Sequence, residues 1–469
     1  MKLRPRTLAG LAAIILIAIV LLLRRGDDRF ERYLAGHRAK GEKFTHQELW
    51  AIQSTNGAPG TTNFLNAATA IQTGLMEPGN ILTMGYSGPG TASPAWRQTQ
   101  IDIGNRIVPG TWDALAGQLE TNRAIFAQLR AALDNPPLDT GLDRRANPFG
   151  PSANFVSQRK AAQWLAAAAL NDLHRENREA ALANLHALVQ LVRMHHNELT
   201  LVNHMIRVAV ARIALDATWE ALQAGGWTDA QLAALQRDWQ SIDLLDNFER
   251  GILGERAMGM AAREELIQSN VTRRMAVLGV QPSMRDRLLH PLWRSTMANT
   301  DFIFYFDQLH ESLEAVRRLR AGEPWPVVQQ QFDAGQERLS GLQDSLKGSL
   351  YWFSGMALPN FSRAALTATR NETQRRMTVV AIALKRCQLK HGRHPAGLAA
   401  LAPEFLAEIP RDPMAGAPFQ YRLEKDSGFT LYSVGEDGKD DGGDATPSAP
   451  GSKRFGLWEC QDAVWPKGK

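Results

Sequence analysis

The sequence predicts a mainly α-helical protein with a membrane anchor at its N-terminus, a body of antiparallel helices and a small C-terminal α+β domain that contains a short antiparallel sheet. Three observations lead to this prediction: an apolar run near the N-terminus, helical spacing of Ala and Leu through the middle of the chain, and alternating apolar residues near its end. A chain of 469 residues, 44% hydrophobic and 22% charged, is long enough for two or three globular domains.

The apolar run extends from Leu8 to Leu23 and follows Lys2, Arg4 and Arg6. At about 1.5 Å per residue a helix of this length spans roughly 24 Å, somewhat less than a hydrocarbon core of about 30 Å. A cleaved signal peptide is the alternative, but the run ends in three leucines and two arginines, without the small-x-small site that cleavage needs. We expect residues 1–25 to form an uncleaved single-pass anchor.

The charges give no sign of a nucleic-acid partner. The chain has 53 basic and 48 acidic side chains, a net charge of only +5, and its Lys and Arg residues are scattered rather than gathered in one stretch. A nucleic-acid-binding protein is expected to collect positive charge on one face. We therefore expect no nucleic-acid binding.

Residues 26–110 are rich in Gly and Pro. Pairs of these residues end a helix or prevent one from forming. We therefore expect an irregular region with short helices, such as one over residues 63–73. The breaks are at Asn56-Gly57, Pro59-Gly60, Pro78-Gly79, Gly88-Pro89-Gly90 and Pro109-Gly110.

Residues 111–370 have the spacing of an antiparallel helical body. A helical stretch over about 157–198, with a break, has apolar residues at steps of three and four, which places them on one helix face. Thr228 and Gln231 form a capping-box pattern that begins a later helix. Short turns between such helices predict antiparallel neighbours. The two predicted apolar faces are Ala181, Leu185, Leu188 and Val192, and Leu232, Leu235, Trp239, Ile242 and Leu245.

An aromatic cluster in this body, Phe302, Phe304, Tyr305 and Phe306, covers all sides of one helix. A platform for stacking nucleic-acid bases would need basic residues between the aromatic ones. We therefore expect a helix that is buried between neighbours rather than one that lines a binding groove.

The helical body carries no compact motif of an enzyme class. Its densest histidine cluster is His195, His196 and His204 with Glu198, but a zinc-binding helix needs two histidines four residues apart with a glutamate between them. The sequence has no Gly-x-Ser-x-Gly, no phosphate-binding Gly-rich loop and no Cys-x-x-Cys. We expect Gly254-Glu255-Arg256 to contribute to a structural ion-pair network, because adjacent helix residues do not face each other and need partners on other helices.

Two cysteines, Cys387 and Cys460, could form a disulfide in an oxidising compartment. Met377, Val380, Leu384 and Cys387 step along one apolar helix face, and Cys460 lies in "LWECQDAVWP", which we expect to form a last strand. A bridge between this helix and this strand would close a long loop. Two separate thiols, each in the protein interior, are the alternative.

An acidic loop near the C-terminus is the strongest metal-site candidate. Four aspartates fall within eight residues, and the glycines between them let the loop fold its carboxylates and carbonyls around one centre. Hard oxygen ligands in this number suit Ca²⁺. The spacing is not that of an EF-hand, and a solvated acidic turn is the alternative. The predicted ligands are Asp437, Asp440, Asp441 and Asp444, spaced by Gly438, Gly442 and Gly443.

Residues 376–465 resemble the globular domain of the major pseudopilin of type II secretion. The resemblance rests on the order of turn residues and of two strands, "FQYRL" and "FTLYSV". It implies an exported, pseudopilin-like α+β domain over residues 371–469 and calcium binding in the loop after the second strand. The helical body, through Gly254-Glu255-Arg256, resembles that of membrane-anchored bacterial proteins with this kind of tail. The matching tail residues are His391, Gly392, Arg393, His394, Pro395, Pro403, Pro410, Asp412, Pro413, Gly416, Tyr421 and Leu431 to Gly435.

The chain departs from a pseudopilin in two ways. No pseudopilin processing site precedes Leu8, and the whole helical body separates the apolar run from the tail. The resemblance therefore implies a bacterial inner-membrane protein with its bulk in the periplasm, whose tail is a structural or docking module of a secretion or pilus-like assembly. A non-enzymatic role is favoured, and an envelope hydrolase or sugar-binding protein with a site in the helical body is the alternative.

Overall fold

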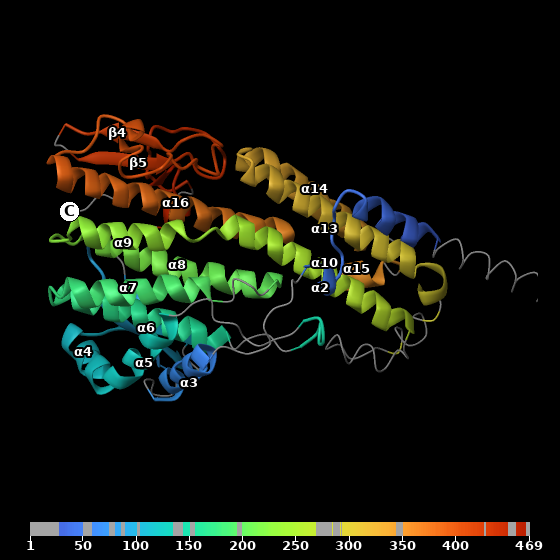
Figure 1. Cartoon of the computed structure of the whole chain (residues 1–469), viewed down its shortest axis with the longest axis horizontal. Coiled ribbons are helices and arrows are strands. Elements are labelled where there is room, and N and C mark those ends of the chain that lie inside the picture. The colour runs from blue at the N-terminus through green and yellow to red at the C-terminus, as the bar shows by residue number, and fades with distance from the viewer. Residues whose placement is uncertain are drawn as a thin grey trace, which may run out of the picture.

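The computed structural model describes residues 28–49, 59–74, 80–85, 90–100, 104–134, 144–150, 155–194, 199–268, 284, 291, 293–343, 350–425, 428–448 and 456–465. The anchor expected at residues 1–25 lies outside them. Within the described residues, no helix combines the length and the apolar character that crossing a membrane requires. These residues form an elongated, mainly helical molecule (Figure 1).

Most of the longer helices lie roughly along the long axis of the molecule, as Figure 1 shows. A first helix covers residues 28–38. The helices that follow are α2 (His46–Leu49), α3 (Pro59–Gly74), α4 (Trp112–Thr121), α5 (Arg123–Leu133), α6 (Phe155–His174), α7 (Arg178–Arg193), α8 (Leu201–Gln223), α9 (Asp229–Gln240), α10 (Leu244–Gln268), α13 (Ala298–Arg320), α14 (Trp325–Gln343), α15 (Trp352–Ala357) and α16 (Phe361–His391), with 3-10 turns η2 (Leu398–Leu401) and η3 (Leu457–Glu459).

The helical body has the expected form. Helix α6 packs against α7 and α8, and α16 packs against α8 and α9. The helical stretch predicted over 157–198 is the pair α6 and α7, which break at residues 175–177, where Glu176 has a positive φ of 60°. Thr228 and Gln231 form the predicted capping box of α9. Every residue of the two predicted apolar faces is buried, which confirms the helical periodicity.

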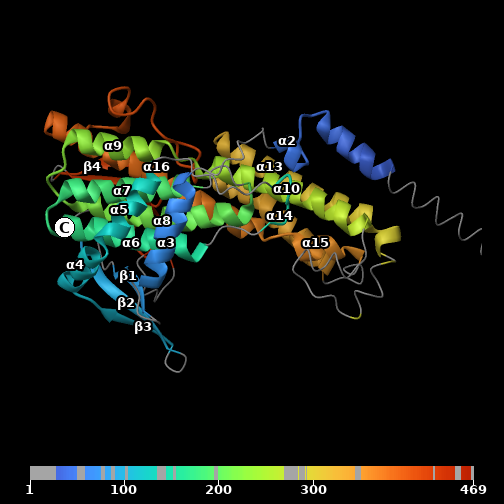
Figure 2. The same ribbon diagram turned by 60° about the horizontal axis from the view of Figure 1, so that its bottom comes forward.

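Residues 80–85, 93–100 and 104–109 form a three-stranded antiparallel sheet, where the sequence led us to expect irregular chain. Of the predicted breaks beside the sheet, Pro109-Gly110 lies at the end of the last strand, whereas Pro78-Gly79 and Gly88-Pro89 lie outside the described residues. The sheet contacts α6 through β1 and is visible beside the helices in Figure 2. The short helix expected over 63–73 is confirmed as part of α3. The strands are β1 (Asn80–Gly85), β2 (Ser93–Gln100) and β3 (Gly104–Pro109).

The C-terminal unit, residues 392–465, contains the expected short antiparallel sheet. Strand β5 lies between β4 and β6 and packs against α16 (Figure 1). Helix α16 continues without a break across residue 371, so the boundary expected between body and tail falls inside a helix that both share. The strands are β4 (Gln420–Leu423), β5 (Phe429–Ser433) and β6 (Ala463–Val464).

Two apolar cores lie along α16. The alanine core joins α3 to α9, the C-terminal half of α16 and the C-terminal unit, and the aromatic core joins the first helix, α10, α13, α14, α15 and the N-terminal half of α16. The predicted aromatic cluster is buried in the second core, except that Phe304 is partly exposed. Buried alanines of the first core include Ala161, Ala162, Ala166, Ala167, Ala169, Ala181, Ala187, Ala211, Ala214 and Ala217. Buried aromatic residues of the second include Phe30, Phe44, Phe248, Trp293, Phe302, Tyr305, Phe306, Trp325, Phe332 and Phe353.

A polar seam separates the two cores halfway along α16. The carboxylate of Glu372, which is fully buried, accepts hydrogen bonds from Leu244 N at 3.1 Å. It also accepts hydrogen bonds from the guanidinium groups of Arg375 and Arg376, at 2.6 and 2.7 Å. Burial alone would raise the pKa of Glu372, but the two arginines outweigh it and hold the pKa at about 2. The ion pair lies within α16, and the hydrogen bond from Leu244 N to its buried carboxylate ties the start of α10 to this helix.

Candidate functional site

The acidic loop leaves the end of β5 and folds back toward that strand. Gly438, Gly442 and Gly443 have positive φ values of 71°, 76° and 80°, a conformation that glycine adopts without strain. These glycines turn the chain so that the Tyr432 hydroxyl on β5 donates a hydrogen bond to Asp440 Oδ1 at 2.9 Å. The glycines and aspartates of the predicted acidic loop thus form a compact loop.

Three of the four predicted ligands shape turns within this loop. Each accepts a hydrogen bond through its carboxylate from the backbone N–H two residues further on, an arrangement typical of Asp in turns. Asp437 and Asp440 are exposed, as is Asp441, whereas Asp444 is partly buried. The donors are Lys439 N to Asp437 at 3.0 Å, Gly442 N to Asp440 at 2.9 Å and Thr446 N to Asp444 at 2.8 Å.

The side chains of the four predicted aspartates do not meet at one centre in this arrangement. Among the described residues, ligand atoms of three acidic, histidine or cysteine side chains come within 4.8 Å of one another only at Glu42, His310 and Glu314. The solvated turn that was the alternative to a calcium site therefore accounts for the positions of Asp437 and Asp440. Any cation at the loop would need backbone oxygens or a further carboxylate.

A further carboxylate does reach the loop, from Asp462 beside β6. Its side chain is fully buried, and Oδ2 accepts hydrogen bonds from Gly443 N at 2.8 Å and Asp444 N at 3.2 Å. Oδ1 has no hydrogen-bond partner in the described part of the chain. Burial raises the pKa of Asp462, the backbone N–H groups of Gly443, Asp441 and Asp444 partly offset this, and the Asp441 carboxylate adds a smaller upward contribution. A buried carboxylate oxygen without a donor needs an explanation, and a bound cation would provide one.

Asp462 was missed by the sequence reasoning because it stands outside the acidic run. The only local signal is a single aspartate two residues after Cys460, just before the last strand. Pairing of β6 with β5 brings it to the loop: Tyr432 lies opposite Val464 and Ser433 opposite Ala463. This contact depends on strand pairing across the C-terminal unit, which a run of neighbouring residues does not reveal.

The cluster at Glu42, His310 and Glu314 is better explained by ion pairs than by a metal. Glu42 accepts hydrogen bonds from Arg256 at 2.7 Å and from Arg317 at 2.6 Å. Burial alone would raise the pKa of Glu42, but the two arginines hold it at about 2. A divalent cation here would stand next to two guanidinium groups that already neutralise this carboxylate.

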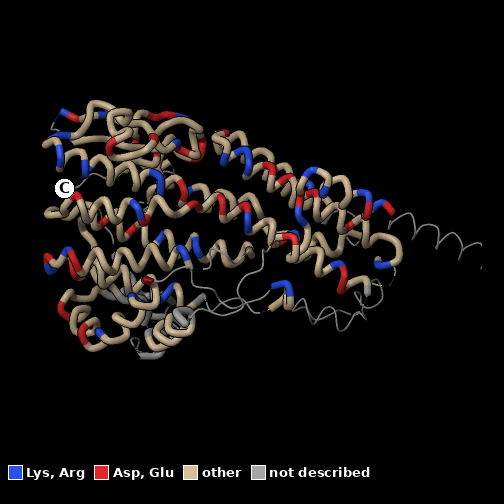
Figure 3. The backbone as a smooth tube through the Cα atoms, in the orientation of Figure 1, with Lys and Arg blue, Asp and Glu red and all other residues tan. Residues whose placement is uncertain are grey.

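The ion-pair network that the sequence analysis expected for Arg256 therefore exists. Arg317 extends it to Glu249 at 2.9 Å, so the network links the segment after the first helix to α10 and α13. Figure 3 shows Lys and Arg interspersed with Asp and Glu along these helices, without a stripe of one sign. The described residues thus agree with the expectation that charge is spread over the molecule.

The disulfide proposed between Cys387 and Cys460 is not formed, and both residues are free thiols. Cys387 is buried on the apolar face of α16, as expected, and its thiol lies 3.8 Å from Arg393 O. Cys460 pairs with Pro447 in an isolated bridge, and its thiol lies 3.6 Å from Gly456 O. Burial raises the pKa of both thiols. The two thiols are therefore separate, as in the alternative that the sequence left open, but only Cys387 is buried, and Cys460 is partly exposed.

The histidine cluster does not form a site in the described residues. His195, His196 and Glu198 lie outside them. His204 is buried in α8 with its ring 5.3 Å from that of Phe248, and neither ring nitrogen has a hydrogen-bond partner in the part of the chain that is described. Burial, with a smaller contribution from Arg207, lowers the pKa of His204 to about 3. A neutral core histidine explains these observations.

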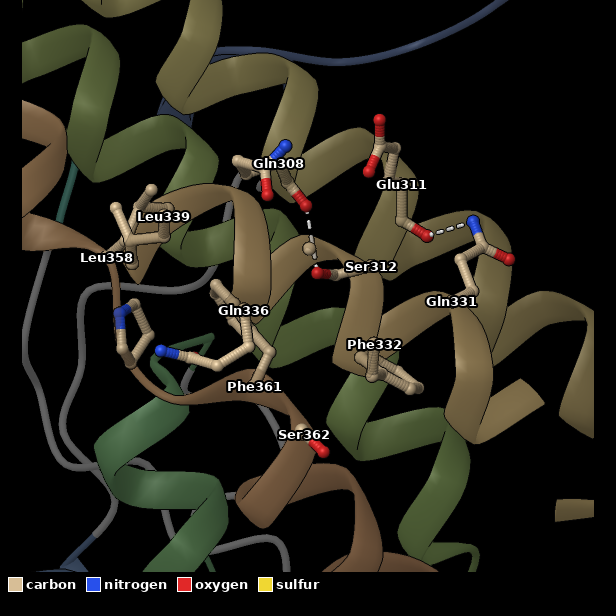
Figure 4. Close-up of a pocket in the computed structure, with 12 residues that line it drawn as sticks. Gln308, Glu311, Ser312, Gln331, Phe332, Gln336, Leu339, Leu358, Phe361 and Ser362 are labelled. Atoms are coloured by element: carbon tan, nitrogen blue, oxygen red, sulfur yellow. Dashed lines mark hydrogen bonds between the residues drawn. The ribbon is translucent and has the colours of Figure 1, made fainter. Parts of the chain in front are cut away.

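The described part of the structure contains one cavity of the size of a water molecule and one of the size of a small-molecule ligand. The one in Figure 4, between α13, α14 and the start of α16, has a volume of about 20 Å³. Ser312 and Gln331 close it with hydrogen bonds to the carbonyls of Gln308 and Glu311, at 2.8 and 2.9 Å. This volume is enough for one water molecule and too small for an organic ligand.

The second cavity has a volume of about 390 Å³, within the range of small-molecule sites. It lies in the helical body, where the start of α8, the middle of α10, α13 and α15 meet the segment 144–150. None of its described lining residues is a histidine, so it lacks the convergence of histidines and carboxylates that a hydrolytic site in the body would need. The charged residues that line it are Arg144 and Glu255.

Comparison of the chain with models of known protein families, with curated proteins and with solved structures gives no match.

Proposed function

We propose that the chain is a bacterial envelope protein, anchored in the inner membrane at its N-terminus, whose helical body carries the C-terminal unit as a non-enzymatic docking element. Its partner would be a secretion or pilus-like assembly. The proposal adds that the acidic loop binds Ca²⁺, which stabilises the surface used for docking. The anchor, the compartment and the partner rest on the sequence pattern and on the resemblance to the pseudopilin domain.

The calcium part rests on one observation, the buried Asp462 oxygen that has no partner in the described residues. Asp440, Asp441 and Asp444 stand on the loop that wraps Asp462, and backbone carbonyls of a glycine-rich loop supply further hard ligands. Asp437 is the least suited of the predicted set, because its carboxylate is paired with Lys439 at 3.4 Å. No three of these carboxylates lie within 4.8 Å of one another in the described arrangement. The proposal is therefore that the loop closes on the ion and brings Asp440, Asp441 and Asp444 to Asp462.

Thermal unfolding of the full chain with calcium or with a chelator tests this proposal. The full chain is needed because α16 is shared between the body and the C-terminal unit. Calcium at a hundredfold excess over its dissociation constant should stabilise the protein by about 2.7 kcal/mol, which corresponds to several degrees in Tm. Magnesium at the same concentration should give a smaller shift, because it demands a tighter octahedral site.

Two matched variants locate the effect. Asp462→Asn removes the charge of the buried carboxylate and should abolish the calcium-dependent shift, whereas Asp437→Asn, on the exposed side of the same loop, should keep it. Because each variant is compared with itself in calcium and in chelator, a change in its basal stability does not confuse the reading. Equal melting temperatures of the wild type in both buffers would contradict calcium binding, and so would a full shift in Asp462→Asn.

The docking role needs a separate experiment. Crosslinking in the native cell, followed by identification of what residues 392–465 contact, should recover a component of a secretion or pilus-like assembly. Recovery of only soluble metabolic enzymes or of peptidoglycan would count against a docking role, whatever the outcome of the calcium measurement.

A further inference from the structure

The 390 Å³ cavity in the helical body has the construction of a ligand site. Its wall is mainly apolar and includes Phe149, Met258, Tyr305, Phe353 and Met356. Aromatic and methionine side chains provide a large contact area that adapts to an apolar ligand. Val202 and Met356 line the cavity and are still 52% and 39% exposed, so apolar surface continues to its mouth.

Two glycines of α10 give the cavity its shape. A Cβ atom at Gly254 would lie 1.3 Å from the carbonyl oxygen of Leu199, and one at Gly259 would lie 2.4 Å from the ring of Tyr305. Helix α10 can therefore approach the start of α8 and the face of α13 only because neither position has a side chain. This close approach brings Glu255, the residue after Gly254, to the N-terminal end of α8.

Glu255 presents a carboxylate to the cavity. One of its oxygens, Oε1, accepts a hydrogen bond from Leu201 N, the first residue of α8, at 3.0 Å, and this is the one hydrogen bond to the carboxylate among the described residues. The side chain remains partly exposed and lines the cavity. The second carboxylate oxygen can therefore accept a hydrogen bond from a ligand.

Arg144 places a positive charge on the wall of the same cavity. Its side chain is 3% exposed and is anchored by a hydrogen bond from Nη1 to Gly150 O at 2.5 Å. The N-terminal end of α8, whose cap residue Thr200 also lines the cavity, adds partial positive charge. Among the described lining residues, the cavity thus combines one negative group, one positive group and an apolar wall. Burial raises the pKa of the Glu255 carboxyl, and the Arg144 charge, which also acts on Glu255, lowers it by a smaller amount.

This combination selects among ligand classes. A ligand with a single charge would meet one group of opposite sign and one of the same sign in a space of low polarity, which weakens the net attraction. A wholly apolar ligand would leave a buried carboxylate oxygen without a donor. A molecule that carries both signs a short distance apart satisfies both walls, and its apolar part can pack against the aromatic and methionine side chains.

We propose that the cavity binds a small zwitterion with an apolar side chain, a free aliphatic or aromatic amino acid or a dipeptide. The ammonium group bonds to Glu255, the carboxylate faces Arg144 and the start of α8, and the side chain packs near Met258 and Phe353. The site lies on the helical body, apart from the C-terminal loop, so its occupancy does not depend on calcium.

Isothermal titration of the full chain with L-phenylalanine, L-leucine and L-leucyl-L-phenylalanine tests the proposal. At least one of the three should bind. N-acetylation of the ligand, which removes the ammonium charge, and amidation, which removes the carboxylate charge, should each weaken binding by about tenfold or more, because each deletes a hydrogen bond to a charged group. These analogue measurements need no variant protein.

A matched pair of variants assigns the carboxylate. Glu255→Gln keeps an acceptor for Leu201 N and should weaken binding by about tenfold or more, whereas Glu264→Gln, the same change at an exposed position of α10, should leave binding unchanged. Thermal unfolding without ligand checks that both variants fold. Absence of binding by all three zwitterions at millimolar concentration would overturn the proposal. So would acetylated and amidated analogues that bind as tightly as the unmodified ligand, or a folded Glu255→Gln variant that binds it as tightly as the wild type.

Discussion

The alanine core and the aromatic core are both built mainly from helices, but their buried side chains differ in size. Around α6 to α8 the buried alanines let helix backbones approach closely, and the interior there is filled by small and aliphatic groups. Around α10, α13 and α15 the buried side chains are mainly aromatic, and the ligand-sized cavity lies there, with Tyr305 and Phe353 in its wall. The ligand-sized cavity thus lies on the side of the molecule whose buried side chains are larger.

Buried charges occur in both regions, and on α8 they include Arg207 and Glu220. The ion pair between Arg256 and Glu42 belongs to the aromatic side of the molecule, whereas Glu372 marks the seam between the two cores. Asp301, which is fully buried, accepts hydrogen bonds from Phe353 N at 2.8 Å and Ser354 N at 3.1 Å. It therefore holds α15, one wall of the cavity, against α13. In the aromatic core, hydrogen bonds to buried charged groups thus act together with apolar packing to hold the helices in place.

The largest expected effect comes from breaking the seam. Glu372→Ala leaves Arg375 buried without its carboxylate partner and removes the acceptor for Leu244 N. We expect the free energy of unfolding to fall by about 3 to 5 kcal/mol, because an uncompensated buried charge is costly. Denaturant unfolding, followed by tryptophan fluorescence, measures it.

The control for the seam is Glu404→Ala, which removes an exposed carboxylate paired with Lys390 and His391. We expect little change, because exposed ion pairs are screened by solvent. If the two alanine variants unfold at the same denaturant concentration, the seam is not what joins the two cores.

An intermediate effect is expected from the same substitution made in each of the two cores, which compares how tightly they are packed. Ala214→Leu adds three carbons to the closely packed alanine core and should destabilise the protein by about 1 to 3 kcal/mol through overpacking. The same change at Ala262, which lines the cavity, should have a much smaller cost because the added carbons enter existing space.

Both substitutions place leucine in the middle of a long helix, so helix propensity is matched between them. Thermal unfolding of the two variants side by side is the measurement. A loss at Ala262 as large as that at Ala214 would show that the aromatic core is packed as tightly as the alanine core.

The smallest and most local effect concerns Asp412 in the C-terminal unit. Burial raises the pKa of Asp412 to about 6, above the ordinary value of 3.8, and hydrogen bonds to its carboxylate only partly offset this. Because the folded pKa is raised, the folded state binds more protons between these two values, and the stability from this group falls as pH rises from 3.8 to about 6. The slope is at most about 1.4 kcal/mol per pH unit.

Asp412→Asn keeps an acceptor for Met414 N but cannot titrate, so its Tm should lack this component of the pH dependence. Glu372 acts in the opposite direction, since its folded pKa of about 2 adds stability that is lost as pH falls below about 4.5. The comparison is therefore best made between pH 5 and 7. Identical pH profiles of wild type and Asp412→Asn over this interval would contradict the raised pKa.

Much of the fold was predictable where the information is local. The capping box at Thr228 and the apolar steps from Ala181 to Val192 depend on residues within a few turns of one helix, and both are confirmed. The strands around Tyr421 and Leu431 were predicted from alternation over a few residues. The sheet formed by β1, β2 and β3 was not predicted, because Gly and Pro pairs occur both at the ends of strands and in irregular loops.

The candidate sites were less predictable because their parts come from distant segments. Asp437 and Asp444 were visible as members of an acidic run, whereas Asp462 becomes part of the loop only when β6 pairs with β5. The cavity was even less predictable from the sequence, because Arg144, Leu201 and Glu255 belong to three separate segments. No spacing along the chain connects them.

The sequence by itself determined the mainly helical class, the helix faces, the caps and the glycine-rich acidic loop. Each of these follows from interactions between residues close in the chain, where periodicity and turn chemistry act directly. Only the tertiary structure decided that the start of α10 meets the buried Glu372 carboxylate of α16, that the two cysteines remain separate, and that a carboxylate from α10 reaches the start of α8. These depend on how closely helices approach, and that distance is set by the sizes of side chains which meet only after the chain has folded.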